Sequence, residues 1–325
     1  MTGKARRDPP PAVDVRAPRA FEIQPVAPFR LDLTAWTLRR RAHNIVDRWD
    51  GTTYRRVLPL PAGPVEVAVT QPGSADAALR VEVAGQRVHA TVQSAVATAL
   101  ERLLGIHVSM SEFDQLAAHD RRLKPLAERF RGMKPPRFAS VFECAVNAIA
   151  CQQVSLTSGI HVLNRLAMSY GPSLGGPNKC AYAFPRPEDL AVLTPAQLRP
   201  LGFSQQKGRA ITELAQSIAS GDLDLESFAS LSDDEAVSRL CELRGLGRWS
   251  AEYVLLRGLG RTHVFPGDDV GARNNLQRWL KRTDSLDYQG VRRVLSRWKR
   301  FGGLIYFHLL LDTLAKAGEL GTTDA

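Results

Sequence analysis

The chain has 325 residues, of which 44% are hydrophobic and 23% are charged, a composition typical of globular proteins that disfavours disordered, collagen-like and coiled-coil classes. No apolar stretch approaches the roughly 20 residues that a membrane helix needs, and the first residues lack the apolar core of a secretory signal, so we expect a cytoplasmic protein. Lys and Arg number 43 against 33 Asp and Glu, and this net charge of +10 indicates a polyanionic partner. Residues 261–300 alone carry ten basic and four acidic residues, which predicts either a solvated helix face or a phosphate-binding surface.

The cysteines and the chain ends limit the chemistry further. The cysteines stand at Cys144, Cys151, Cys180 and Cys241, too far apart for a zinc or iron–sulfur motif, and we expect buried free thiols. Residues 1–22 are rich in Pro and basic residues and predict a flexible tail, and residues 319–325 predict a second, shorter one.

Residues 23–95 predict a small domain built around an antiparallel sheet, because hydrophobic residues recur there with a period of two. The pattern predicts strands around residues 65–69, 81–83 and 88–92, the last two joined as a hairpin through residues 84–86, a turn at residues 50–51, and a helix over residues 34–49. The fold class expected for the whole chain is α+β.

Residues 96–318 predict an all-helical region of about eight or nine helices. Its clearest elements are helices over 141–151 and 156–170, a Gly/Pro-rich connection over 172–187, a helix that begins at Pro195, and a helix from 233 to 241 that opens with a capping box.

A two-glycine turn follows this last helix. In the segment 243–253, Gly245 and Gly247 separate two helices, and such glycines permit a tight turn with a positive φ. The turn exposes backbone N–H groups beside a helix N-terminus, which can bind a phosphate without any side chain. By itself the pattern favours an ordinary helical hairpin with a glycine cap.

Two adjacent carboxylates, Asp268 and Asp269, follow a Pro/Gly turn about 20 residues later, at the start of another helix. Asp is a common N-cap, which is the structural explanation for one of them. A carboxylate at a helix N-terminus is also stabilised as the anion, which suits a group that faces developing positive charge on a substrate.

These segments resemble the helix-hairpin-helix superfamily of DNA glycosylases, and most closely the DNA-3-methyladenine glycosylase II type. The resemblance is carried in chain order by residues 142–155, 201–211, 243–253 and 265–273, and it extends over about 138–312. It implies a helical glycosylase core, with the hairpin at about 236–258, behind a small mixed N-terminal domain. It also implies base excision repair as the function.

The resemblance implies that Asp269 is the catalytic residue. Its expected role is to stabilise the oxocarbenium-like sugar and to orient or deprotonate the attacking water. Asp268 would be a supporting or capping residue. Members that also cut the strand carry a Lys where this chain has Trp249, so the resemblance implies a monofunctional hydrolase that leaves an abasic site.

The flipped base is expected to stack on Trp249 and Tyr253, which share a helix face, although both could instead be core residues. A third pocket aromatic of the family is replaced by Leu310. Tyr306 or Phe307 could compensate, and sequence spacing does not decide between them.

The remaining contacts implied by the resemblance concern DNA. The wedge that fills the gap left by the flipped base is Gln153. Lys207 and Arg273 are candidate phosphate contacts. The phosphate-binding hairpin comprises Gly245, Leu246, Gly247 and Arg248, and the carbonyls of Cys241, Leu243 and Leu246 could hold a Na or K ion.

The function expected is therefore hydrolysis of the N-glycosidic bond of alkylated bases in duplex DNA by a monomer that needs no redox or nucleotide cofactor. Two alternatives stay open: a glycosylase of the same fold for another lesion, such as hypoxanthine or an oxidised purine, and a helix-hairpin-helix protein that binds damage without catalysis. A generic helical interaction protein is a third, which would make the hairpin and the Asp pair coincidental.

Overall fold

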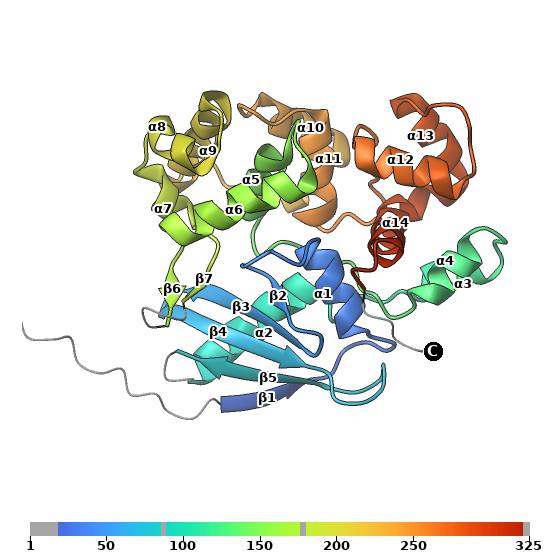
Figure 1. Ribbon diagram of the computed structural model, residues 1–325, viewed down its shortest axis with the longest axis horizontal. Coiled ribbons are helices and arrows are strands. Elements are labelled where there is room, and N and C mark those ends of the chain that lie inside the picture. The colour runs from blue at the N-terminus through green and yellow to red at the C-terminus, as the bar shows by residue number, and fades with distance from the viewer. Residues whose placement is uncertain (1–18, 86–88, 176–179, 321–325) are drawn as a thin grey trace, which may run out of the picture.

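The computed structural model describes residues 19–85, 89–175 and 180–320, and it places a five-stranded sheet below a larger, mostly helical part (Figure 1). The predicted tails lie largely outside the described residues. Residues 19–22 are an exception, because they belong to the first strand and not to the tail as predicted.

The sheet is antiparallel throughout, in the order β1-β5-β4-β3-β2. Its strands are β1 (Arg19–Ile23), β2 (Arg48–Trp49), β3 (Thr53–Leu60), β4 (Gly63–Thr70) and β5 (Leu79–Ala84). The predicted alternation is confirmed in β4, where Val65, Val67 and Val69 are fully buried. The turn predicted at residues 50–51 is confirmed as well, since Asp50 accepts hydrogen bonds from the backbone N–H groups of Thr52 and Thr53.

Two helices, α1 (Leu31–Arg39) and α2 (Ala90–Leu104), pack on this sheet and share its apolar core. The hairpin predicted over 81–92 is therefore wrong: α2 starts at Ala90, and residues 86–88 lie outside the described part. The physical reason is helical spacing, because Val92, Val96 and Leu100 recur every four residues and are all buried. The domain boundary predicted near residue 95 falls inside α2.

The helix predicted over 34–49 is too long. It ends at Arg39 because Arg40 adopts a left-handed conformation with a φ of 62°, and Arg48–Trp49 pair with β3 instead. Because α1 ends at Arg39, the chain can turn back to the sheet, where Arg48 and Trp49 pair with β3.

The remaining helices confirm the strongest sequence patterns. The structure has α3 (Ser111–Ala118), α4 (Leu123–Arg129), α5 (Val141–Cys151), α6 (Leu156–Tyr170), α7 (Pro187–Ala191), α8 (Pro195–Leu198), α9 (Gln205–Ala219), α10 (Asp233–Glu242), α11 (Arg248–Arg257), α12 (Val270–Trp279), α13 (Tyr288–Leu295) and α14 (Gly302–Lys316). A capping box opens α10 as predicted, and Thr194 is the N-cap of α8 with Pro195 at its first position, also as predicted. The predicted number of helices is too low because several of these elements are only one or two turns long.

The helical part is not all-helical as predicted. Two short strands, β6 (Ser173–Leu174) and β7 (Ala181–Tyr182), pair within the Gly/Pro-rich connection and lie against β4 and β3. Within the described residues, no helix is long and apolar enough to cross a membrane. The expectation of buried thiols holds for Cys144 alone, since Cys151 is half-buried and Cys180 and Cys241 are exposed.

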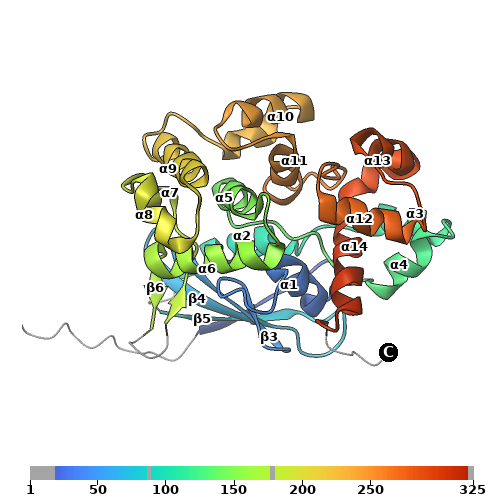
Figure 2. The ribbon, with the colours of Figure 1, turned by 45° about the horizontal axis from the view of Figure 1, so that its top comes forward.

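Two apolar cores divide the helical part. One lies among α5, α6, α9, α10 and α11, and the other among α3, α4, α12, α13 and α14. The two groups stand side by side in both views (Figures 1 and 2), with α11 and α14 at the boundary between them. A ligand site between two packed groups of helices is a common arrangement.

Buried polar residues join α1 and the sheet to α5. Arg56 of β3 donates to Asp47 at 2.7 Å and to Glu143 of α5 at 2.6 Å, and all three side chains are buried. Arg40 donates to Asn147 of α5 at 2.6 Å. We refer to these five residues, Arg40, Asp47, Arg56, Glu143 and Asn147, as the buried seam.

Candidate active site

The turn between α10 and α11 depends on one glycine, not on two as predicted. Gly245 has a φ of 80°, and a Cβ there would lie 2.7 Å from the Cβ of Ala210. Gly247 has extended backbone that any residue can adopt, with open space around it. Gly247 is the N-cap of α11 and provides no side-chain hydrogen bond to the first turn. Phosphate binding by this helix N-terminus stays a prediction.

Gln152 connects the α5–α6 turn to this hairpin by hydrogen bonds. Its side-chain amide donates to the Gly245 carbonyl at 2.6 Å and to the Ser250 hydroxyl at 2.9 Å. Lys207 supports the same turn by donating to the carbonyls of Ala150 and Gln152 at 3.0 and 2.7 Å. The Lys207 ammonium thus caps α5, and its role as a phosphate contact stays a prediction.

Gln153 lies at the tip of the α5–α6 turn, where it is exposed and has a φ of 55°. This conformation is uncommon for residues other than glycine and holds the side chain at a fixed point of the turn. Its role as a wedge stays a prediction.

Glu252 of α11 anchors the loop that carries the Asp pair. Its carboxylate accepts from the backbone N–H of Gly267 at 2.9 Å and from the hydroxyl of Tyr288 at 2.6 Å. Burial raises the pKa of Glu252. Beyond the anchored loop, Asp269 is the N-cap of α12 and accepts from the Ala272 N–H at 2.9 Å.

Asp268 points elsewhere. It accepts from the Arg248 guanidinium at 2.6 Å, and that guanidinium lies 4.0 Å from the centre of the Tyr288 ring. Asp268 is therefore not the helix cap, and the side chain of Arg248 reaches toward the loop. The pair links the second helix of the hairpin to the segment that positions Asp269.

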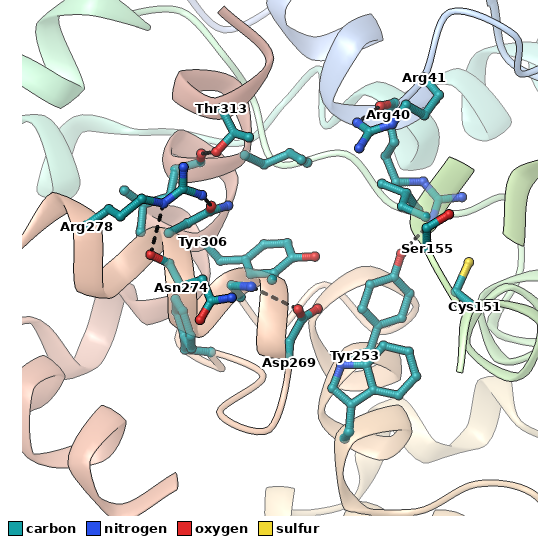
Figure 3. A pocket seen from close by; sticks show the side chains of 18 of the residues that line it. Arg40, Arg41, Cys151, Ser155, Tyr253, Asp269, Asn274, Arg278, Tyr306 and Thr313 are labelled. Atoms are coloured by element: carbon teal, nitrogen blue, oxygen red, sulfur yellow. Dashed lines mark hydrogen bonds between the residues drawn. The ribbon is translucent and has the colours of Figure 1, made fainter. Parts of the chain in front are cut away.

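A cavity of about 450 Å³ opens between α11 and α14, within the usual range for small-molecule sites. Asp269, Trp249, Tyr253 and Leu310 all line it, so the structure brings together the residues that the sequence assigned to the catalytic group and the base pocket. Figure 3 shows Asp269 between Tyr306 on one side and Tyr253 on the other.

Tyr306, and not Phe307, supplies the additional aromatic ring. Tyr306 lines the cavity beside Leu310, whereas Phe307 is fully buried in the neighbouring core. The ring of Tyr306 meets that of Phe265, which also lines the cavity, edge to face at 5.9 Å. The pocket is therefore aromatic despite the leucine at position 310.

Trp249 and Tyr253 share a face of α11 as predicted, and their role in stacking on a flipped base stays a prediction. The ring centroids of Trp249 and Tyr253 lie 5.8 Å apart with their planes 31° from parallel, and both rings line the cavity. Burial raises the pKa of Tyr253 and of Tyr306, and the carboxylate of Asp269 raises that of Tyr306 further. Both phenols are thus neutral near pH 7 and can donate hydrogen bonds.

Sequence reasoning missed several pocket residues, among them Arg40. It lines the cavity from the end of α1, where its guanidinium donates to the Tyr253 hydroxyl at 3.0 Å. The two residues are 213 positions apart, and nothing in the run of Arg39, Arg40 and Arg41 indicates which one enters the site. Glu252 and Gln152 were also not assigned a role, although both belong to segments that carry the resemblance.

The carbonyls proposed for a cation lie in the last turn of α10, at Cys241, and in the turn that follows it, at Leu243 and Leu246. That of Leu243 accepts from the Leu246 N–H at 3.1 Å and retains a second lone pair, so a monovalent ion is compatible with the turn. The described residues contain no group of three or more His, Cys, Asp or Glu side chains that could bind a metal ion.

Comparisons with known proteins agree with this arrangement. Residues 146–300 match the family model of the helix-hairpin-helix superfamily of base excision DNA repair proteins. The chain is 31% identical to a putative DNA-3-methyladenine glycosylase of Bacillus subtilis over 50% of this chain and 55% of the relative. It is 30% identical to DNA-3-methyladenine glycosylase 2 of Escherichia coli over 55% of this chain and 60% of that relative. The matches thus span between half and two thirds of the length of these curated relatives.

The likeness to a solved structure is more extensive. The 3-methyladenine DNA-glycosylase from Archaeoglobus fulgidus superposes with a TM-score of 0.79 at 26% identity, over 90% of this chain and 97% of that chain. An MBOgg1 structure shares the fold at 19% identity with a TM-score of 0.74. The helical region of the chain is therefore similar to the helix-hairpin-helix superfamily of base excision DNA repair proteins, and the curated relatives that it matches here are named DNA-3-methyladenine glycosylases.

Proposed function

We propose that the protein is a monofunctional DNA glycosylase that hydrolyses the N-glycosidic bond of alkylated bases in duplex DNA. The observation that carries this proposal is the position of Asp269, a carboxylate at the N-terminus of α12 that lines a cavity whose walls are aromatic. A protein that only binds DNA gains nothing from an anion at this point, because the anion repels phosphates.

The chemistry follows from the charges. As the bond between the base and C1′ breaks, positive charge develops on the sugar, and the Asp269 carboxylate stabilises it from close by. The same carboxylate orients the attacking water or accepts its proton. Trp249 occupies the position where an amine would be needed to form a Schiff base, so the product is an abasic site in an uncut strand.

The proposed DNA contacts come from two neighbouring turns, the α5–α6 turn and the turn between α10 and α11, which the hydrogen bonds of Gln152 connect. The N-terminus of α11 at Gly247 would bind a backbone phosphate, and Gln153 would fill the gap in the stack. A monovalent cation on the carbonyls of Cys241, Leu243 and Leu246 would strengthen the same phosphate contact. With duplex DNA as its partner, the protein would act at the nucleoid in the cytoplasm.

The test is release of bases from methylated duplex DNA at about 0.1 M salt, where phosphate contacts are only partly screened. The strand is analysed before and after hot alkali, with Asp269→Asn as the inactive control. We expect base release by the wild type, strand breaks only after alkali, and loss of release in the variant. Tight, salt-sensitive binding with no release from methylated DNA would favour a damage-binding protein or another lesion.

A further inference from the structure

Two arginines at the opening of the pocket carry a positive charge that no acidic side chain pairs with. Arg41 and Arg278 line the same cavity as Asp269, and both reach solvent, since Arg41 is half-buried and Arg278 is exposed. Within the part of the chain that the structure describes, neither forms an ion pair. Arg248, at the start of α11, differs from them because Asp268 neutralises it.

Neutral acceptors hold both guanidinium groups in place. Arg41 donates from Nε to the hydroxyl of Thr157 in α6 at 3.3 Å and from Nη1 to a neighbouring backbone carbonyl at 2.9 Å. Arg278 donates from Nε to the backbone carbonyl of Asn274 at 3.3 Å and from Nη2 to the side-chain oxygen of Asn275. A guanidinium has five N–H donors, so each group keeps donors for a further acceptor. The two charges are therefore oriented but not cancelled.

The two arginines come from different parts of the fold and lie on opposite sides of the catalytic candidate. Figure 3 shows Arg41 on one side of the pocket and Arg278 on the other, with Asp269 between them. Arg41 follows α1, which packs on the sheet, whereas Arg278 belongs to α12. The third arginine of the pocket, Arg40, belongs to the buried seam, where two acidic residues balance two arginines.

A flipped nucleotide brings negative charge to these two places. When its base enters the pocket and its C1′ approaches Asp269, the phosphates on its 5′ and 3′ sides lie at opposite edges of the opening. The carboxylate of Asp269 repels both phosphates. A guanidinium at each edge compensates this repulsion and offers the paired N–H donors that fit phosphate oxygens.

We propose that Arg41 and Arg278 bind the two phosphates that flank the flipped nucleotide, one on each side, and that the sheet domain thereby takes part in DNA binding. The inference rests on the proposed function and specifies how the site holds the damaged strand. The contacts form only around a nucleotide that has left the helix, so they favour damaged over intact duplex. They are separate from the phosphate contact proposed for the hairpin, whose glycines do not line this cavity.

The test measures binding of the full-length protein to duplexes that contain one tetrahydrofuran residue, a stable analogue of the abasic product. In two further duplexes an uncharged methylphosphonate replaces the 5′ or the 3′ phosphate of that residue. Arg41→Gln and Arg278→Gln each remove one charge, and Arg41→Lys keeps it. Arg80→Gln is the matched control, because Arg80 is an exposed arginine of β5, in the sheet and away from the pocket (Figure 1). Fluorescence anisotropy at several salt concentrations gives the dissociation constant and its salt dependence.

We expect each Gln variant to weaken binding to the unmodified analogue by about tenfold at about 0.1 M salt. The slope of log affinity against log salt should become shallower by about one, the effect of one lost phosphate contact. Arg41→Lys should keep the wild-type slope, because an ammonium also neutralises a phosphate, and Arg80→Gln should change neither quantity. The losses should be smaller on intact duplex of the same sequence.

The methylphosphonates identify which phosphate each arginine binds. One replacement should weaken binding by the wild type but not further weaken binding by Arg41→Gln, and the other replacement should behave in this way with Arg278→Gln. Equal sensitivity of wild type and variants to both replacements would overturn the inference. Losses no larger than that of Arg80→Gln, or equally large on intact duplex, would also overturn it.

The proposed function fails or holds in a different measurement. If the wild type releases no methylated base, the proposed function is refuted, while the binding comparison still shows whether the two arginines contact the phosphates. If the wild type releases methylated bases and the variants bind the analogue as the wild type does, only the inference is refuted.

Discussion

The sheet domain and the buried seam beside it are held together by different forces. The sheet packs α1 and α2 onto Val65, Val67, Val81 and their neighbours with almost wholly apolar side chains. The seam that joins α1 and the sheet to α5 is made of charged and polar groups that are equally well buried. Apolar contacts tolerate small shifts, whereas hydrogen bonds between charged groups fix distance and direction. We infer that the sheet core supplies stability and that the seam fixes where Arg40 enters the pocket.

The largest effect on stability should come from the seam. Arg56→Ala leaves Asp47 and Glu143 buried without their cation, so we expect the free energy of unfolding to fall by about 3–5 kcal/mol. Urea denaturation followed by tryptophan fluorescence measures this loss. A loss below about 1 kcal/mol, the value for an exposed ion pair, would contradict the central position that we assign to Arg56.

A matched change in the sheet should separate stability from activity. Leu79 is fully buried in the sheet core, and Leu79→Ala should lower the free energy of unfolding by about 3 kcal/mol, within the usual range for such truncations. Base release per folded molecule should stay at the wild-type rate, because no seam residue is touched. A changed preference among lesions in this variant would contradict the proposed division of roles, in which the sheet core supplies stability and the buried seam positions pocket residues.

A neutral buried group in the helical part should give a pH-dependent effect of similar size. Burial lowers the pKa of His308 from 6.5 to about 4, and its ring lies 4.9 Å from that of Phe113. Between these pH values the unfolded chain binds a proton that the folded protein does not, so stability is complete above pH 6.5 and falls as the pH drops toward 4. Between pH 6.5 and 4 the free energy of unfolding should therefore fall by about 3 kcal/mol because of His308. Comparing the pH dependence of wild type and His308→Gln isolates this loss. Parallel pH curves for the two proteins would contradict the assignment.

The smallest effect is expected at the turn that faces DNA. Gln152→Ala removes two hydrogen bonds between the α5–α6 turn and the hairpin, which should lower the free energy of unfolding by about 1–2 kcal/mol. DNA binding should weaken and base release from bound DNA should change little. Gln153→Ala is the matched control one residue on, with no stability change expected because Gln153 is exposed.

The sequence predicts the local elements well and the contacts between them poorly. Some elements are determined by a few neighbouring residues. The strand β4 follows from the alternation of Val65, Val67 and Val69, and two helix starts follow from the N-caps Thr194 and Ser232, so all three were predictable. Asp269 was predictable as well, because its loop resembles that of a known family.

Long-range contacts carried no comparable signal. Position 40 reaches the pocket because α1 ends one residue before it, in a left-handed conformation that the Arg run does not indicate. The helix at Ala90 was mistaken for a strand because Val88, Ala90 and Val92 also fit a period of two, and only packing on the sheet decides between the periods. Tyr306 and Phe307 likewise needed the orientation of α14 to be told apart.

The most direct test of the account compares the two adjacent carboxylates. Asp268→Asn and Asp269→Asn each remove one negative charge from the same loop, and Asn is as good an N-cap as Asp, so both variants should fold as the wild type does. We predict that Asp269→Asn lowers single-turnover base release by about a thousandfold, while Asp268→Asn, which breaks only the pair with Arg248, stays within about tenfold. Near-full activity of Asp269→Asn, or equal losses in the two variants, would contradict the assignment of Asp269 as the catalytic residue.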